Sequence, residues 1–172
     1  MRVCVAGAAG AFGMKHLDAI KNIDGVEVTS VVGRRPEDIE AFAKDRKIGH
    51  WTTDLNESLE RSDIDAVILA TPTQVHAEQA IACMKAGKHV FIEIPMADSL
   101  ADSEDIVRVQ KETGMVAVAG HVRRFNPSHQ WINNKIRFSE LKIQQIDVQT
   151  FFFRRSNMNA AGNPRSWTDH LL

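Results

Sequence analysis

Apolar and polar stretches alternate along the first two thirds of the chain in a way that predicts strands and helices in turn. An apolar run over residues 66–70 stops at Thr71-Pro72-Thr73, a helical pattern follows to Gly87, and a second apolar run from His89 stops at Glu93-Ile94-Pro95. Short apolar runs on both sides of an amphipathic segment are typical of a parallel strand–helix–strand unit. Because ligands bind beyond the carboxyl ends of strands in open parallel sheets, we expect both polar turns on the ligand side.

The same alternation covers residues 1–120. Strands are expected at 2–6, 26–32, 50–53 and 116–120, and helices at about 11–21, 36–46, 56–61 and 100–112. Ser99 and Asp102 predict the start of the last helix and Gly114 its end. The pattern predicts an α/β fold: a six-stranded, doubly wound parallel Rossmann sheet with a domain boundary near Gly120.

A glycine-rich loop joins the first strand to the first helix. Its sequence, Gly7-Ala8-Ala9-Gly10-Ala11-Phe12-Gly13, has the spacing G-x-x-G-x-x-G. Glycines there permit a tight turn and let backbone N–H groups approach a pyrophosphate at the helix N-terminus. A glycine-rich turn alone is a weak signal, but its place after a strand and before a helix favours dinucleotide binding. The predicted cofactor-binding residues of this loop are Gly7, Gly10, Ala11, Phe12 and Gly13.

Two arginines, Arg34 and Arg35, follow the second strand, where an enzyme that selects NAD usually carries an acid. Guanidinium groups at this place suit the 2′-phosphate of NADP. The alternative is a pair of solvated arginines at the start of a helix. We expect NADP as the cofactor, with Thr71, Pro72 and Thr73 among the residues that bind it.

The region after Gly120 has a different pattern. A helix is expected to run to about Phe138, followed by one long strand from Ile143 to Phe153. A single strand cannot satisfy its hydrogen-bonding edges. Residues 121–172 are therefore expected to begin a second, α+β domain with an open sheet. The remaining strands would come from a longer protein or, less favoured, from a partner.

Composition narrows the class of protein. The net charge is −1, so no nucleic-acid partner is expected, and no apolar stretch approaches the roughly 20 residues that span a bilayer. Cys4 and Cys83 both lie in apolar patterns, which predicts buried thiols in a reducing compartment, and neither a disulfide nor a metal site. The expected location is the cytoplasm.

Several motifs together resemble those of the Gfo/Idh/MocA family of NAD(P)-dependent oxidoreductases. They are the glycine loop, Thr71-Pro72 with His76, Ala86-Gly87-Lys88-His89-Val90, the Glu93-x-Pro95 turn and Gly120-x-x-Arg123-Arg124-Phe125. The resemblance implies a Rossmann domain followed by an α/β domain whose open sheet carries substrate and homo-oligomer contacts. A narrower resemblance is to members that use NADP to oxidise the cyclic hemiacetal of a carboxylated muconate semialdehyde in the breakdown of aromatic compounds. It covers residues 67–72, 76–84, 93–95, 123–129 and 151–172.

The chain departs from the family at Ile94, where most members have a catalytic lysine. Isoleucine cannot move a proton, so another group must accept the hydroxyl proton during hydride transfer. Histidine has a suitable ordinary pKa of about 6.5, and the candidates are His121 and His170. The resemblance implies that the family's own catalytic histidine would fall beyond Leu172. Each of the two candidates has a structural role as its alternative.

The remaining candidates follow from the same chemistry. His76 is expected against the cofactor, or as a structural histidine, and Glu93 at the nicotinamide ribose, or as a solvated strand end. A small carboxylated substrate needs planar, two-pronged donors. The predicted substrate-binding residues are Ile94, Arg123, Arg124, Arg154 and Arg165. Two other functions stay open: a sugar or cyclitol dehydrogenase, and an NADP-binding sensor without turnover.

Overall fold

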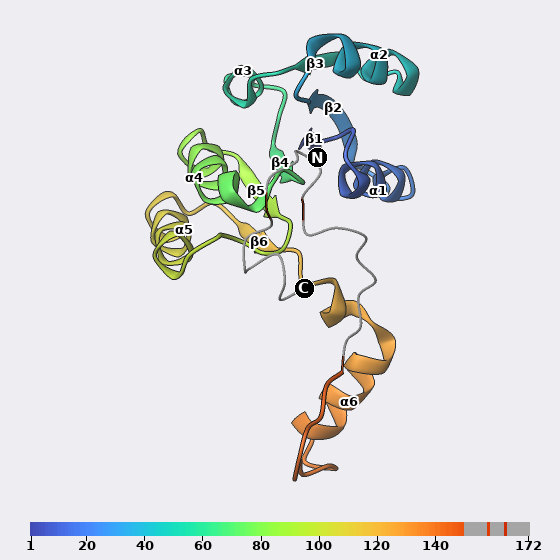
Figure 1. Ribbon diagram of the computed structural model, residues 1–172, viewed down its shortest axis with the longest axis vertical. Helices are drawn as coiled ribbons and strands as arrows, with labels where there is room; N and C mark the ends of the chain where they lie inside the picture. Colours follow the sequence, from blue (N-terminus) through green and yellow to red (C-terminus); the bar gives the residue numbers. More distant parts are fainter. Residues whose placement is uncertain (150–157, 159–163, 165–172) are drawn as a thin grey trace. The chain divides into compact units, whose positions relative to one another are not determined.

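The computed structural model describes residues 1–149, 158 and 164. The chain divides into two compact units, Met1–Gly120 and a second that begins at His121 (Figure 1). The first unit carries the sheet and is the alternating region of the sequence.

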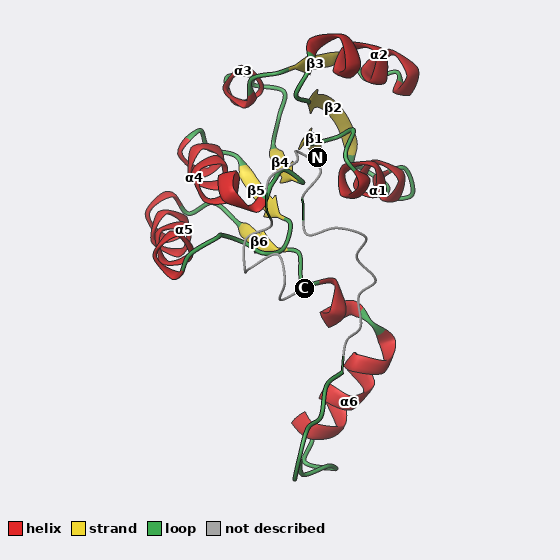
Figure 2. Ribbon diagram, viewed as in Figure 1, coloured by secondary structure: helices red, strands yellow, loops and turns green. Residues whose placement is uncertain are grey.

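The sheet of the first unit has six strands, all of them parallel. They are β1 (Arg2–Ala6), β2 (Glu27–Val32), β3 (His50–Thr52), β4 (Ala66–Leu69), β5 (His89–Ile92) and β6 (Ala117–Ala119). Their order across the sheet is β3-β2-β1-β4-β5-β6, and Figure 2 shows them in yellow. The predicted doubly wound parallel sheet is thereby confirmed. The order reverses between β1 and β4, which is the switch point where such sheets bind ligands.

Five α-helices connect the strands, and the two halves of the sheet are covered from opposite sides. They are α1 (Ala11–Ile20), α2 (Pro36–Arg46), α3 (Leu55–Leu59), α4 (His76–Lys85) and α5 (Leu100–Thr113). In Figure 1, α1 and α2 lie on one side of the strands, and α4 and α5 on the other. The predicted cap of α5 is confirmed, because the Ser99 hydroxyl accepts the backbone N–H of Asp102 at 3.1 Å. Gly114 ends the helix in the left-handed conformation.

The side chains of β1 alternate between two hydrophobic cores. Val3 and Val5 pack with residues of α1 and α2, whereas Cys4 and Ala6 pack with residues of α4 and α5. This alternation follows from the two-residue period of a strand, and burying one valine contributes about 1.5–3 kcal/mol. Both cysteines are buried and unpaired, as predicted. Burial raises the pKa of the Cys4 thiol to about 11 and that of the Cys83 thiol to about 12.

The second unit contains the 3-10 turn η2 (Val122–Phe125) and helix α6 (Pro127–Arg137), which agrees with the helix expected to run to about Phe138. The predicted strand from Ile143 is wrong over residues 143–149, which form no strand; its last four residues lie outside the described part. The reason is that a strand needs a hydrogen-bonded neighbour, and residues 143–149 find none within the described chain. No helix in the described part is long and apolar enough to cross a membrane.

Candidate cofactor site

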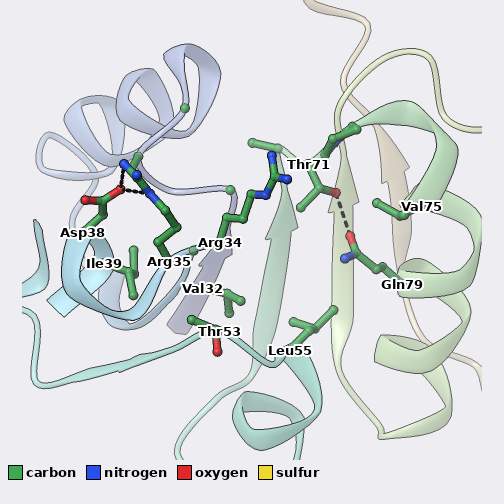
Figure 3. Close-up of a pocket in the computed structure, with 16 residues that line it drawn as sticks. Val32, Arg34, Arg35, Asp38, Ile39, Thr53, Leu55, Thr71, Val75 and Gln79 are labelled. Atoms are coloured by element: carbon green, nitrogen blue, oxygen red, sulfur yellow. Dashed lines mark hydrogen bonds and ion pairs between the residues drawn. The ribbon is translucent and has the colours of Figure 1, made fainter. Parts of the chain in front are cut away.

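A pocket of about 450 Å³ opens at the switch point of the sheet, within the first unit. Its walls come from the carboxyl ends of β1, β2 and β4 and from the first turns of α2 and α4. Figure 3 shows the lining residues, which are Gly7, Ala9, Gly10, Val32, Gly33, Arg34, Arg35, Asp38, Ile39, Thr53, Leu55, Ala70, Thr71, Pro72, Val75 and Gln79. The volume lies within the range of ordinary small-molecule sites.

The glycine loop makes the floor of the pocket by close backbone approach. Gly7 has φ +76°, and a Cβ there would lie 2.4 Å from the carbonyl oxygen of Ala70, which directly follows β4. A Cβ on Gly13 would lie 2.2 Å from the carbonyl oxygen of Gly7. Both positions therefore exclude a side chain. Gly10 precedes α1 without a side-chain cap, so the free N–H groups of the first helical turn remain available to an anion.

The two arginines after β2 have different surroundings. The Nε of Arg35 donates to the Asp38 carboxylate at 2.6 Å, and a second nitrogen of the same guanidinium completes an ion pair with it. Arg34 makes no ion pair or side-chain hydrogen bond within the described residues. In Figure 3 its guanidinium extends into the space between the glycine loop and the Thr71 side of the pocket, whereas Arg35 turns back toward α2. Arg34 is the cation free to meet a bound phosphate.

The turn after β4 forms the opposite wall, and α4 holds it in place. The Thr71 hydroxyl donates to Gln79 Oε1 at 2.6 Å (Figure 3), and the Thr71 carbonyl oxygen lies 2.8 Å from His76 Nε2. His76 is only 1% exposed, and its Nδ1 lies 2.8 Å from the carbonyl oxygen of Pro95. The histidine therefore lies beneath the wall of the pocket and joins two turns, and its ring does not line the cavity.

Glu93 is engaged inside the protein. It is 8% exposed, its Oε1 accepts from His16 Nε2 on α1 at 2.6 Å, and its Oε2 accepts the Ile94 N–H at 3.3 Å. Burial by itself would raise the pKa of Glu93, but the bonds from His16 and Ile94 and the nearby His16 and His76 hold it below the ordinary value. Ile94 is half-buried.

The structure brings together six of the predicted cofactor residues in one pocket: Gly7, Gly10, Arg34, Arg35, Thr71 and Pro72. Six others do not line it. Ala11 and Phe12 are exposed on α1, and four are buried: Gly13, Thr73, His76 and Glu93.

Sequence reasoning missed Asp38 and Gln79, both on first turns of helices that follow sheet strands. Asp38 lies three residues after Arg35 on a helix, and that i,i+3 spacing is the signal that could have found it.

The candidates for chemistry on the substrate lie elsewhere. His121, Arg123 and Arg124 are exposed residues of the second unit, and the Arg123 carbonyl oxygen lies 3.1 Å from His129 Nδ1. His170, Arg154 and Arg165 lie outside the described residues. The assignment of a catalytic base stays a prediction.

Comparison with known protein families supports the dinucleotide site. The family described as "Oxidoreductase family, NAD-binding Rossmann fold" (Gfo/Idh/MocA) matches residues 1–121, and "Bacterial oxidoreductases, C-terminal" matches residues 127–172. A solved relative, a probable dehydrogenase from Thermotoga maritima, has a TM-score of 0.76 at 26% identity, over 81% of this chain and 42% of that one.

Among curated relatives, a 4-carboxy-2-hydroxymuconate-6-semialdehyde dehydrogenase from Sphingobium sp. (strain NBRC 103272 / SYK-6) is 63% identical over the whole chain and 54% of its own length. A scyllo-inositol 2-dehydrogenase (NAD(+)) from Bacillus subtilis is 31% identical over 80% of the chain and 41% of its own length. The same organism has a scyllo-inositol 2-dehydrogenase (NADP(+)) at 31% identity over 66% of the chain and 35% of its own length. The chain thus spans about half the length of these relatives or less, and they include both NAD and NADP enzymes.

Proposed function

The chain belongs to the Gfo/Idh/MocA family of oxidoreductases, and we propose that the whole protein is an NADP-dependent dehydrogenase acting on a small, carboxylated cyclic hemiacetal. One observation supports the choice of cofactor: the uncapped start of α1 and the guanidinium of Arg34, which has no partner among the described residues, face one pocket at the switch point of the sheet. The first suits a pyrophosphate and the second a 2′-phosphate. NAD has no group that would use Arg34 in this way.

The residues of the pocket would bind and orient the cofactor. Backbone N–H groups of the first turn of α1, after Gly10, would hold the pyrophosphate, and Thr71 with Pro72 would border the ribose on the β4 side. When bound, the cofactor would supply the acceptor for a hydride. Ile94 would offer the substrate an apolar contact, since its side chain carries no polar or ionisable group.

The substrate class is proposed from the 63% identical relative and from basic residues of the second unit. In the proposed reaction the hemiacetal carbon of the substrate would lose a hydride to the nicotinamide, and the hydroxyl on that carbon would lose a proton to a base. The carbon would then be the lactone carbonyl of 2-pyrone-4,6-dicarboxylate. Arg123 and Arg124 are proposed to bind substrate carboxylates, because guanidinium groups make two-pronged contacts with them. A neutral sugar would offer such arginines no charged partner.

The deciding experiment follows NADPH formation by the full-length enzyme with the hemiacetal and with a panel of sugars and inositols. We expect turnover of the hemiacetal, and strongly raised KM in Arg123→Met and Arg124→Met with NADP affinity unchanged. Lysine at either position should restore KM only in part, because an ammonium makes a single-point contact. Turnover of the sugars without the hemiacetal would replace this proposal with a sugar dehydrogenase. NADP binding without turnover of any substrate would indicate a sensor.

A further inference from the structure

Among the histidines that the structure describes, His76 is distinguished by having both of its ring nitrogens close to carbonyl oxygens. Nε2 lies 2.8 Å from the oxygen of Thr71, and Nδ1 lies 2.8 Å from the oxygen of Pro95. The two carbonyls belong to separate turns, one at the wall of the cofactor pocket and one next to Ile94. The side chain is 1% exposed, so water does not compete for either nitrogen.

The hydrogen-bonding capacity of imidazole makes this arrangement informative. A carbonyl oxygen only accepts hydrogen bonds, and a neutral imidazole has one N–H donor and one bare, accepting nitrogen. If the ring of His76 were neutral, its bare nitrogen would face a carbonyl oxygen across one of the two contacts. Neither of these two accepting atoms would then have a hydrogen-bond donor there. Only the imidazolium form, with a proton on each nitrogen, makes both contacts favourable.

Glu93 provides the compensating charge. It is the one buried carboxylate among the described residues, and its charge interacts with that of His76. His16 of α1 donates to its Oε1. The charged residues of α3 and α5, which pack against α4, are exposed, and Asp98, which follows Pro95 by three residues, is half-buried. A buried cation at His76 is thus opposed by one buried anion.

We propose that His76 carries a proton on both ring nitrogens and in that form fixes the Thr71 turn of the cofactor pocket against the turn at Ile94. It is a positioning residue of the dehydrogenase proposed above. The protonation state of the ring holds whatever the cofactor, whereas the effect on cofactor binding rests on the proposed function. The same helix also holds the Thr71 hydroxyl through Gln79, so α4 fixes this turn at two points.

The protonation state can be read directly by nitrogen-15 NMR of the uniformly labelled chain at about pH 7.5. Two-bond ring correlations should show both nitrogens of His76 protonated, with His76→Gln used to assign the signals. A bare nitrogen on the His76 ring would overturn the proposal.

Cofactor affinity tests the positioning role. Calorimetry should show NADP binding weakened about fivefold or more in His76→Gln, because a single amide nitrogen replaces two ring nitrogens that each meet a different carbonyl. The matched control is His89→Gln, the same change at an exposed residue at the start of β5, which should bind NADP like the wild type.

Wild-type affinity in a folded His76→Gln variant would overturn the positioning role. Failure of the wild-type chain to bind NADP would instead refute the proposed function and leave the NMR result standing. If His76→Gln does not fold, the wild-type NMR signature still decides the protonation state. Gln79→Ala removes a lining side chain and its bond to the Thr71 hydroxyl but leaves both His76 contacts, so it should then show a smaller loss of affinity than fivefold.

Discussion

The cofactor pocket predicts that its two arginines contribute unequally to NADP binding. Arg34 has no partner within the described chain, so its guanidinium can meet the 2′-phosphate without first breaking a contact. A charge-assisted hydrogen bond contributes about 1.5–3 kcal/mol. Arg34→Ala should therefore weaken NADP binding by about 10- to 150-fold and leave NAD binding nearly unchanged.

Arg35 should matter less because it is already paired with Asp38. Both side chains are more than half exposed, so the pair itself contributes only about 0.3–0.5 kcal/mol and can open. The carboxylate nevertheless stays beside the phosphate site and offsets the charge of the arginine. Asp38→Asn should tighten NADP binding about fivefold, which corresponds to about 1 kcal/mol for unit charges roughly 4 Å apart in water.

Calorimetric titration of NADP and NAD into each variant measures these effects. The control is Lys44→Ala, which removes the same charge from the far end of α2, where Lys44 pairs with Glu40. It should change neither affinity. Equal NADP affinity in Arg34→Ala and the wild type would refute the assignment of the 2′-phosphate site. NADP binding that weakens in Asp38→Asn would show that this carboxylate helps to bind the ribose.

Three further predictions concern the fold. Burial raises the pKa values of the Cys4 and Cys83 thiols to about 11 and 12, so both should resist iodoacetamide at about pH 8 until denaturant is added. Labelling of the native chain at the rate of a free thiol would contradict this. Gly13→Ala should abolish NADP binding and lower the melting temperature, because its Cβ would lie 2.2 Å from a backbone oxygen, whereas Gly49→Ala, with open space around it, should do neither. The pKa of Asp65 is held below its ordinary range by hydrogen bonds from the arginine that opens β1, so its contribution to stability is present above about pH 4 and is lost as the pH falls toward the folded-state value. Asp65→Asn should therefore lower the urea midpoint at pH 7, and the difference in midpoint between the variant and the wild type should be smaller at about pH 3. The same difference at both pH values would contradict the link between the Asp65 pKa and stability.

The sequence by itself determined the elements of the first unit and their arrangement. Helix Pro36–Arg46 and the caps of α5 agree with the prediction, because capping and periodicity depend on residues a few positions apart. The doubly wound parallel arrangement followed as well, since parallel crossovers are short and right-handed and leave few alternatives. The glycine loop, the two arginines and Thr71-Pro72 were placed at one site because the carboxyl ends of parallel strands share one edge of the sheet.

Only the tertiary structure decided which side chain meets which. Glu93 was expected at the cofactor, yet it bonds His16, 77 positions away, and His76 meets carbonyls of two turns that are adjacent only after folding. The strand expected from Ile143 was wrong over residues 143–149 for a related reason. Apolar alternation gives a segment the capacity to pair, but a strand forms only beside a neighbour that supplies its hydrogen bonds, and such neighbours, like the partners of buried side chains, come from distant parts of the chain.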